Sequence, residues 1–218
     1  MSTADYYRQK DASYYALVRY DVIGMIPHGV RRMLDIGCSN GATSAVAKEQ
    51  LGIEETVGVE PFASSAALAA GHMDRVLTAD IEALDDLGFP DGYFDCIICA
   101  DVLEHLRDPW AVLRFLRRYL SDDGCLIASI PNIQHIVPLL KMARNRFEYE
   151  EHGILDRTHL RFFTLHTMVR MFTDAGFAVE KVESNRSNSL PYRLATIATL
   201  GLFRPFTVFQ YRLRCRKA

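Results

Sequence analysis

Five short apolar runs, each followed by a segment long enough for a helix or a loop, constrain the fold of this chain most strongly. Runs rich in Val, Ile and Leu without polar alternation are typical of strands buried on both faces. Strands joined by long crossover segments pair in parallel, with helices on both faces of the sheet. The sequence therefore predicts an α/β fold. The expected strands are "RRMLDIG" at 31–37, "TVGVE" at 56–60, "RVLTAD" at 75–80, "FDCIICA" at 94–100 and "CLIASI" at 125–130.

The C-terminal third adds two strands and one insertion. We expect "FAVEKVES" at 177–184 to be the sixth strand and "FQYRLRC" at 209–215 to be the seventh. The seventh alternates aromatic or apolar residues with Gln and Arg, which is the period of a half-buried strand. We interpret it as an edge strand whose arginines face solvent and hinder pairing with another chain. A helical insertion is expected near 191–203. Weak peripheral contact of this segment with a membrane is kept as an alternative hypothesis.

Length and charge limit the domain organisation and the partners. A chain of 218 residues, 49% of them hydrophobic, suits a single domain. We divide it into an N-terminal helical cover at 1–29, a ligand-binding half at 30–130, and a lid with the C-terminal strands at 131–218. The net charge of −2 gives no field that would draw the chain onto nucleic acid. The absence of a leader-like start and of a long apolar run predicts a cytoplasmic protein without a transmembrane segment.

The five cysteines do not indicate a disulfide framework, because their number is odd and they are scattered along the chain. "CIIC" resembles a zinc-binding pair. On a strand, however, a spacing of three places Cys96 and Cys99 on opposite faces of the sheet. We therefore expect both to be core residues.

The stretch "MLDIGCSNGATSAVA" predicts a strand, a glycine-bearing turn and a helix, an arrangement that brings backbone amides close to a ligand. Its glycines, Gly37 and Gly41, do not have the G-x-G-x-x-G spacing of dinucleotide sites, which disfavours a nicotinamide cofactor. Glu60 ends the second strand, where a carboxylate can accept hydrogen bonds from ribose hydroxyls. Asp80 and Ile81 follow the third strand and offer an acceptor and an apolar surface to adenine. A nucleoside without phosphates fits this site.

The motifs "LDIGCSNG", "VGVEP", "ADIEAL" and "FDCIICADVLEHLRDP", in this order, resemble the class I S-adenosylmethionine-dependent methyltransferases. The resemblance covers about 30–182 and implies a Rossmann-like, seven-stranded, mostly parallel sheet with helices on both faces and an antiparallel last strand. It also implies S-adenosylmethionine as cofactor and a methyl transfer reaction. By resemblance, the cofactor-binding residues are Asp35, Gly37, Cys38, Ser39 and Gly41 at the methionine end, Glu60 and Pro61 at the ribose, Asp80 and Ile81 at the adenine, and Ala100 and Asp101 beside the sulfonium.

The segment "DVLEHL" follows the fourth strand and would face the methyl group. One hypothesis makes His105, or another histidine, the general base for an acceptor hydroxyl. A second makes Asp101, Glu104 and His105 ligands of a divalent metal, since D-x-x-E-H is similar to the E-x-x-E-H of ubiquinone-biosynthesis and small-RNA 2′-O-methyltransferases. Here Asp replaces the first Glu. A third makes the cluster structural, and all three stay open.

The acceptor side is expected in the long segment at 131–164, whose mixed aromatic and charged residues suit a lid. We expect catalytic roles for His135 and His159, alongside His105 and Asp101, with Arg157 and Tyr149 as acceptor contacts. The pattern from "PNIQH" to "THLRFFT" resembles methyltransferases that act with glycosyltransferases, which implies a sugar or glycan hydroxyl and a role in polysaccharide biosynthesis. The alternatives are a quinone, phenol or natural-product O- or N-methyltransferase, and a non-catalytic S-adenosylmethionine-binding subunit.

Overall fold

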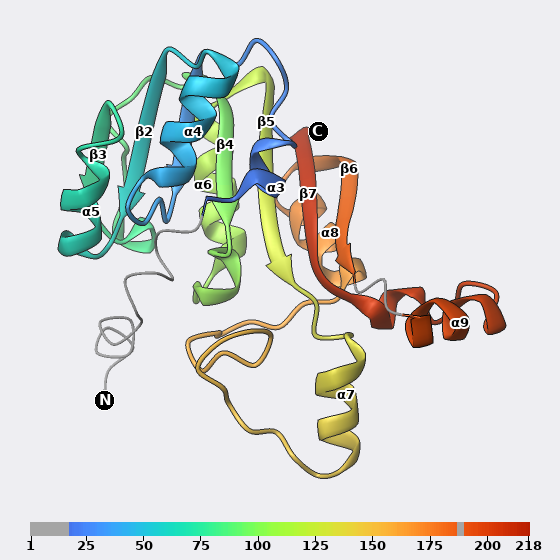
Figure 1. The fold of residues 1–218 in the computed structure, drawn as a ribbon. Coiled ribbons are helices and arrows are strands. Elements are labelled where there is room, and N and C mark those ends of the chain that lie inside the picture. The colour runs from blue at the N-terminus through green and yellow to red at the C-terminus, as the bar shows by residue number, and fades with distance from the viewer. Residues whose placement is uncertain (1–17, 187–189) are drawn as a thin grey trace.

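The computed structural model describes residues 18–186 and 190–218, so the predicted N-terminal cover is described only from residue 18 onward. These residues form one seven-stranded sheet with the strand order β3-β2-β1-β4-β5-β7-β6. Helices α3 and α4 lie on one face of the sheet, and α6 and α8 lie on the other (Figure 1). The predicted Rossmann-like α/β fold with helices on both faces is confirmed.

All seven predicted strands are present. The strands are β1 (Arg32–Ile36), β2 (Glu55–Glu60), β3 (Arg75–Thr78), β4 (Phe94–Ala100), β5 (Leu120–Pro131), β6 (Phe177–Arg186) and β7 (Val208–Lys217). The helices are α3 (Tyr20–Ile23), α4 (Ala42–Leu51), α5 (Ala63–Ala69), α6 (Pro109–Tyr119), α7 (Ile136–Ala143), α8 (Leu165–Asp174) and α9 (Leu190–Ala198), with short 3₁₀ helices η1 (Ile81–Ala83), η2 (Leu103–His105) and η3 (Arg204–Thr207). The expected insertion near 191–203 is α9 and the turn that follows it.

The order of the parallel strands reverses beside β1, which pairs with β2 on one side and with β4 on the other. The chain proceeds outward from β1 to β2 and β3, and then returns to β4 and β5. In open α/β sheets, a reversal of this kind leaves a crevice at the carboxyl ends of the two central strands. The residues that follow β1, β2, β3 and β4 therefore lie along one edge of the sheet.

Strand β7 corrects one sequence-based expectation. It lies inside the sheet, antiparallel to both β5 and β6, so β6 rather than β7 is the edge strand. Its arginine side is not a solvated edge either: Arg212 is buried and forms ion pairs with Asp21 and Glu183. The alternation of β7 therefore reflects an apolar face against the core and a polar face on which Arg212 is covered by α3, whereas Arg216 is exposed.

Two hydrophobic clusters pack against the two faces of the sheet. The larger one joins the sheet to α6 and α8, and the smaller one joins it to α3 and α4. Cys99 belongs to the first cluster and Cys96 to the second, so the two thiols lie on opposite faces as predicted. Among the described residues, no helix is long and apolar enough to cross a membrane.

Local sequence determines where the two helices on the larger cluster begin. The carboxylate of Asp108 accepts a hydrogen bond from the amide of Ala111, and Pro109 supplies a preset φ at the first position of α6. Thr164 caps α8 through a reciprocal pair of hydrogen bonds with Thr167. These caps orient the apolar faces of α6 and α8 toward the sheet.

The internal position of β7 is testable through Leu213, which is fully buried against α6 and α8. We predict that Leu213→Ala lowers the free energy of unfolding by about 2–5 kcal/mol, because it leaves a cavity in the core. Val182 is paired with Leu213 across β6 and β7 but is 42% exposed, so Val182→Ala is the matched control, with an expected loss below about 1 kcal/mol. Chemical denaturation measures both. Equal losses would contradict an internal β7.

Candidate functional site

The turn after β1 brings the backbone close to the crevice. Gly37 and Gly41 adopt positive φ angles of 68° and 78°, and Ser39 between them has a φ of 53°. A Cβ on Gly37 would lie 2.7 Å from the side chain of Val102, and one on Gly41 would contact Ala69 tightly. Glycine is therefore required at both positions for conformation and for space. The turn holds its amides at the carboxyl end of β1, as predicted.

Asp35 lies at the base of this turn, buried, and accepts a 2.5 Å hydrogen bond from the hydroxyl of Ser44. Burial raises the pKa of its carboxyl to about 7, because the charged form loses hydration; the bond from Ser44 opposes this effect and the charge of Glu60 adds to it. An ionised Asp35 would attract a cationic group placed in the crevice.

Glu60, at the end of β2, is buried beside the turn. One carboxylate oxygen accepts a hydrogen bond from the amide of Ser39 at 2.9 Å, and the other accepts from the amide of Phe62 at 3.1 Å. Burial raises the pKa of Glu60, while the two backbone bonds lower it. Each oxygen keeps a second lone pair that can accept from a ligand hydroxyl.

The other predicted cofactor residues lie along the same edge in different environments. Asp80 is exposed and caps η1 by accepting from the amide of Glu82, whereas Ile81 is buried in the larger hydrophobic cluster. Cys38 is buried against Gly58, where a Cβ would lie 2.5 Å from the Cys38 sulfur, and burial raises the pKa of its thiol. Pro61 is exposed and Ala100 is half-buried.

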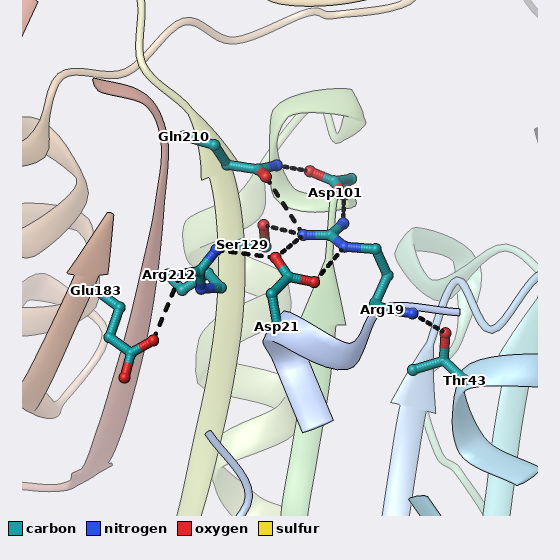
Figure 2. A network of polar contacts seen from close by, with 8 residues as sticks. All are labelled: Arg19, Asp21, Thr43, Asp101, Ser129, Glu183, Gln210 and Arg212. Atoms are coloured by element: carbon teal, nitrogen blue, oxygen red, sulfur yellow. Dashed lines mark hydrogen bonds and ion pairs between the residues drawn. The ribbon is translucent and has the colours of Figure 1, made fainter. Parts of the chain in front are cut away.

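Asp101, after β4, joins a polar network that the sequence did not predict (Figure 2). Its carboxylate accepts hydrogen bonds from the guanidinium of Arg19 and from the side-chain amide of Gln210. Arg19 also donates to Asp21 at 2.9 and 3.0 Å, and to the hydroxyl of Ser129 at 2.9 Å. Burial alone would lower the pKa of Arg19, but the carboxylates of Asp21 and Asp101 raise it. The guanidinium therefore stays charged.

This network joins α3 to three strands. Arg212 of β7 donates to Asp21 at 2.9 Å and to Glu183 of β6 at 3.4 Å (Figure 2). The backbone amide of Arg19 donates to the hydroxyl of Thr43, at the start of α4. Two signals in the sequence could have indicated the network. Ser129 is a polar residue within an apolar run, and polar residues alternate with apolar or aromatic ones along the segment that forms β7.

The segment after Asp101 forms a second cluster. Glu104, His105 and His159 each offer a potential metal-ligating atom, and these atoms lie within 4.8 Å of one another. Asp101 is not in this set, and its carboxylate accepts hydrogen bonds from Arg19 and Gln210. Within the described residues, the potential ligating atoms that lie together come from two residues of the hypothesised metal set, Glu104 and His105, and from His159 of the lid.

Hydrogen bonds to backbone carbonyls orient both rings of this cluster. Nδ1 of His105 lies 3.1 Å from the carbonyl of Thr158, and Nδ1 of His159 lies 3.0 Å from the carbonyl of Ile154. A carbonyl only accepts, so each Nδ1 carries the hydrogen and each neutral ring keeps a basic Nε2. The ring centroids are 4.7 Å apart. The two histidines thus share the tautomer that can receive a proton or bind a metal through Nε2.

Glu104 lies beneath these rings and is 1% exposed. Its backbone carbonyl accepts from the amides of Leu160 and Arg161, which ties the lid to η2. Neither oxygen of its carboxyl group has a hydrogen-bond partner among the described residues. Burial, together with the charge of Asp101, raises the pKa of Glu104 well above its usual value. Such a group is neutral unless a cation lies beside it.

His135 does not share the arrangement of the other two histidines. It is the N-cap of α7, and its Nδ1 accepts from the amide of Val137 at 3.3 Å, so its hydrogen is on Nε2. Burial lowers its pKa, and its ring packs against Phe209. A ring in this tautomer donates a hydrogen bond rather than accepting a proton. Tyr149 and Arg157, the expected acceptor contacts, are exposed on the lid.

Comparisons with known proteins agree with this fold and these motifs. A family model described as a methyltransferase domain matches residues 9–182. The solved structure of a SAM-dependent methyltransferase from Archaeoglobus fulgidus is similar, with a TM-score of 0.63 and 21% sequence identity. The similarity covers 99% of this chain and 92% of that one. At this identity the likeness supports the fold alone.

Curated relatives match over shorter stretches. A ubiquinone biosynthesis O-methyltransferase from Xanthomonas oryzae pv. oryzae is 31% identical over 121 residues, which are 54% of this chain and 48% of that protein. A 27-O-demethylrifamycin SV methyltransferase from Amycolatopsis mediterranei is 34% identical over 109 residues, which are 47% and 40% of the two chains. The chain thus spans about half the length of these two curated relatives, or less.

The buried carboxyl of Asp35 predicts a distinct pH dependence of stability. The folded protein holds the Asp35 proton more tightly than the unfolded chain, so this contribution is fully present below about pH 4 and is lost as the pH rises through about 7. We expect the free energy of unfolding of wild type, relative to Asp35→Asn, to fall by roughly 1–4 kcal/mol between pH 4 and 8. Denaturant titrations of both proteins at each pH measure the difference. A constant difference would show that Asp35 ionises normally.

Proposed function

We propose that this chain, which belongs to the methyltransferase-domain family, binds S-adenosylmethionine. We further propose that it transfers the methyl group to a hydroxyl of a small molecule. The observation that carries the acceptor half of the proposal is the pair formed by His105 and His159 near the end of β4, with ring centroids 4.7 Å apart and each ring oriented by a hydrogen bond from Nδ1 to a backbone carbonyl. The crevice at the switch point between β1 and β4 supports the cofactor half.

The cofactor supplies a methyl group on a sulfonium that is already activated for transfer. This chain's residues would hold it along the sheet edge. The glycine turn offers backbone amides, and Asp35 offers a negative charge to the methionine end. The free lone pairs of Glu60 suit the two ribose hydroxyls, and Asp80 with Ile81 suits adenine. Cys38 packs against Gly58 and supports the turn, since its raised pKa disfavours a thiolate.

Catalysis of methyl transfer then requires alignment of the acceptor and removal of its proton. Histidine is a common general base in enzymes, so His105 or His159 would take this proton in the proposal. Asp101 is a positioning residue in this proposal, because its carboxylate is used by Arg19 and Gln210. His135 would donate a hydrogen bond to the acceptor rather than serve as the base.

The same cluster also fits a divalent cation. Glu104 supplies carboxyl oxygens without a protein partner, and His105 and His159 supply ring nitrogens. A cation held by these three residues would acidify an acceptor hydroxyl, and its charge would favour ionised Glu104. If the cluster acts as a base, turnover should persist after a chelator is added. If the cluster binds a metal, the chelator should abolish turnover.

For the acceptor, we propose a sugar or glycan hydroxyl, which rests on the resemblance of the lid pattern. The second candidate is a phenolic or quinone-like hydroxyl. It is favoured by the aromatic rings that line the lid, since Phe162 packs against both His159 and Phe147, and Phe147 packs against Tyr149. It also agrees with the name of the similar protein from Xanthomonas oryzae pv. oryzae, a ubiquinone biosynthesis O-methyltransferase. A panel of free sugars, nucleotide sugars and catechols distinguishes the two classes.

The ribose role of Glu60 predicts the effect of Glu60→Gln. The amide has one accepting oxygen in place of two, so we expect the dissociation constant for S-adenosylmethionine to rise by roughly tenfold or more. Calorimetric titration measures this, and circular dichroism checks the fold. Glu54→Gln, which changes an exposed acid paired with Arg31, is the matched control. An unchanged affinity in Glu60→Gln would remove Glu60 from the cofactor site.

The base hypothesis predicts that His159→Asn and His105→Asn lower the kcat for a hydroxyl acceptor by about 10²–10⁴ while leaving the cofactor affinity within about twofold of wild type. His166→Asn, on the exposed side of α8, is the control and should keep wild-type turnover.

Treatment with EDTA separates the two roles of the cluster. Turnover that persists after chelation supports a base, and turnover that is lost and is then restored by Mg²⁺, Mn²⁺ or Zn²⁺ supports a metal. If both histidine variants keep wild-type kcat, the cluster has a structural role and this part of the proposal is wrong.

A further inference from the structure

Exposed hydrophobic side chains concentrate at one end of the molecule. Of the fifteen large hydrophobic side chains that are exposed in the described chain, twelve lie between residues 137 and 160 or between 190 and 209. Single exposed apolar residues are common on proteins, but a contiguous group marks an interaction surface. The most exposed members are Leu190, Leu194, Ile197, Leu200 and Leu202.

Helix α9 presents an apolar face that the described residues do not cover. Leu190, Leu194 and Ile197 follow the i, i+4, i+7 spacing of one helical face, and their exposed fractions are 67%, 57% and 70%. Leu200 and Leu202, in the turn that follows, are 94% and 79% exposed. By contrast, the apolar positions Val112 and Leu116 of α6 are buried against the sheet. The described residues thus leave this face of α9 open to a partner.

The charge around this face has one sign. The last acidic residue in the sequence is Glu183, so neither α9 nor the turn after it carries an acid, whereas Arg193 and Arg204 are both present. In α7 and the turn that follows it, residues 136–147 contain three basic residues and no acidic one. Lys141 of α7 is paired with Glu150 of the lid, so this lid carboxylate lies beside α7.

Topology places this surface at the ligand-binding edge of the sheet. Strands β5 and β6 are both antiparallel to β7, so they run in the same direction, and α7 and α9 leave the sheet at the same edge as the glycine turn. The side-chain amide of Asn132, after β5, donates to the carbonyl of Pro205, in η3, at 3.0 Å, and His135 packs against Phe209. Figure 1 shows α7 and α9 extending beyond the carboxyl ends of the strands.

An anionic lipid surface satisfies both properties of α9, its apolar side chains and its flanking arginines. A second copy of the chain fits less well. A two-fold contact through α9 would bring Arg193 and Arg204 of each copy toward those of the other, with no acid in the segment to offset them. The helix is nine residues long, which suits lying in the interface rather than crossing a bilayer.

We infer that α9 and the turn after it, residues 190–204, form a docking surface for membranes that contain anionic lipids. This places the cofactor edge of the sheet toward the lipid surface. If the function proposed above also holds, the acceptor is an amphiphile or a lipid-linked molecule that the protein takes from the interface. The docking itself does not depend on methyl transfer.

The test is cosedimentation of the full chain with phosphatidylcholine vesicles, with and without about one-third phosphatidylglycerol. Wild type is expected to bind the anionic vesicles at least roughly tenfold more tightly than the neutral ones, and to be released at about 1 M salt. The variant I197E/L200E should lose about tenfold or more of this binding, and R193Q/R204Q should lose the preference for anionic lipid. The control is Leu68→Glu on α5, which is 63% exposed outside this surface.

All the substituted side chains are exposed, so circular dichroism should show an unchanged fold. The inference is overturned if wild type stays in the supernatant with anionic vesicles, or if Leu68→Glu weakens binding as much as I197E/L200E does. It is also overturned if sedimentation velocity shows a dimer that I197E/L200E dissociates while vesicle binding stays unchanged, because a second copy would then cover α9. No cofactor or acceptor is present in these measurements, so their failure is separate from a failure of the proposed methyl transfer.

Discussion

Parallel pairing of β1 with both β2 and β4 is the constraint on which the rest of the structure depends. It directs the carboxyl ends of the central strands to one edge and leaves space there, because the connections after β1 and β4 depart in opposite directions. The glycine turn, Glu60 and Asp101 are close to one another only through this pairing. Each lies in a different part of the chain, and none is positioned by its own local structure alone.

The free-energy cost of burying charged side chains explains how α3 is attached to the sheet beside this edge. Arg19, Asp21 and Arg212 lie between α3 and the sheet, where unpaired charges would lose hydration without compensation. Each finds an opposite charge or a hydrogen-bond acceptor on a neighbouring element (Figure 2). The network therefore couples α3 to β5, β6 and β7, and makes the position of Asp101, directly after β4, depend on the segment that precedes β1. Substituting Arg19, for example, would remove one of the partners of both Asp21 and Asp101.

The histidine cluster and the proposed lipid-docking surface both owe their positions to the topology of the sheet. The lid returns to η2 through the backbone of Leu160 and Arg161, which brings His159 to His105 above the buried Glu104. The strands that flank this lid, β5 and β6, direct α7 and α9 beyond the sheet edge, where their apolar side chains are exposed. The reactive cluster and the proposed lipid-docking surface therefore lie at the same end of the molecule, which is the arrangement an interfacial acceptor would need.

The sequence by itself determined the features that depend on a few neighbouring residues. Apolar runs predicted the first five strands, and alternation predicted β7. Glycines predicted the turn after β1, and the positions of Glu60 and Asp80 followed from the ends of β2 and β3. The tertiary structure alone decided the features that join distant segments. Arg19 binds Asp101, which lies 82 residues later in the chain, and His105 binds Thr158 of the lid, 53 residues later. Strand β7 lies between β5 and β6 in the sheet. Alternation along β7 indicated two different faces, but it could not show that α3 covers the polar one. Local periodicity encodes how a segment folds, whereas the partner of a buried charge is set by which segments the completed sheet brings together.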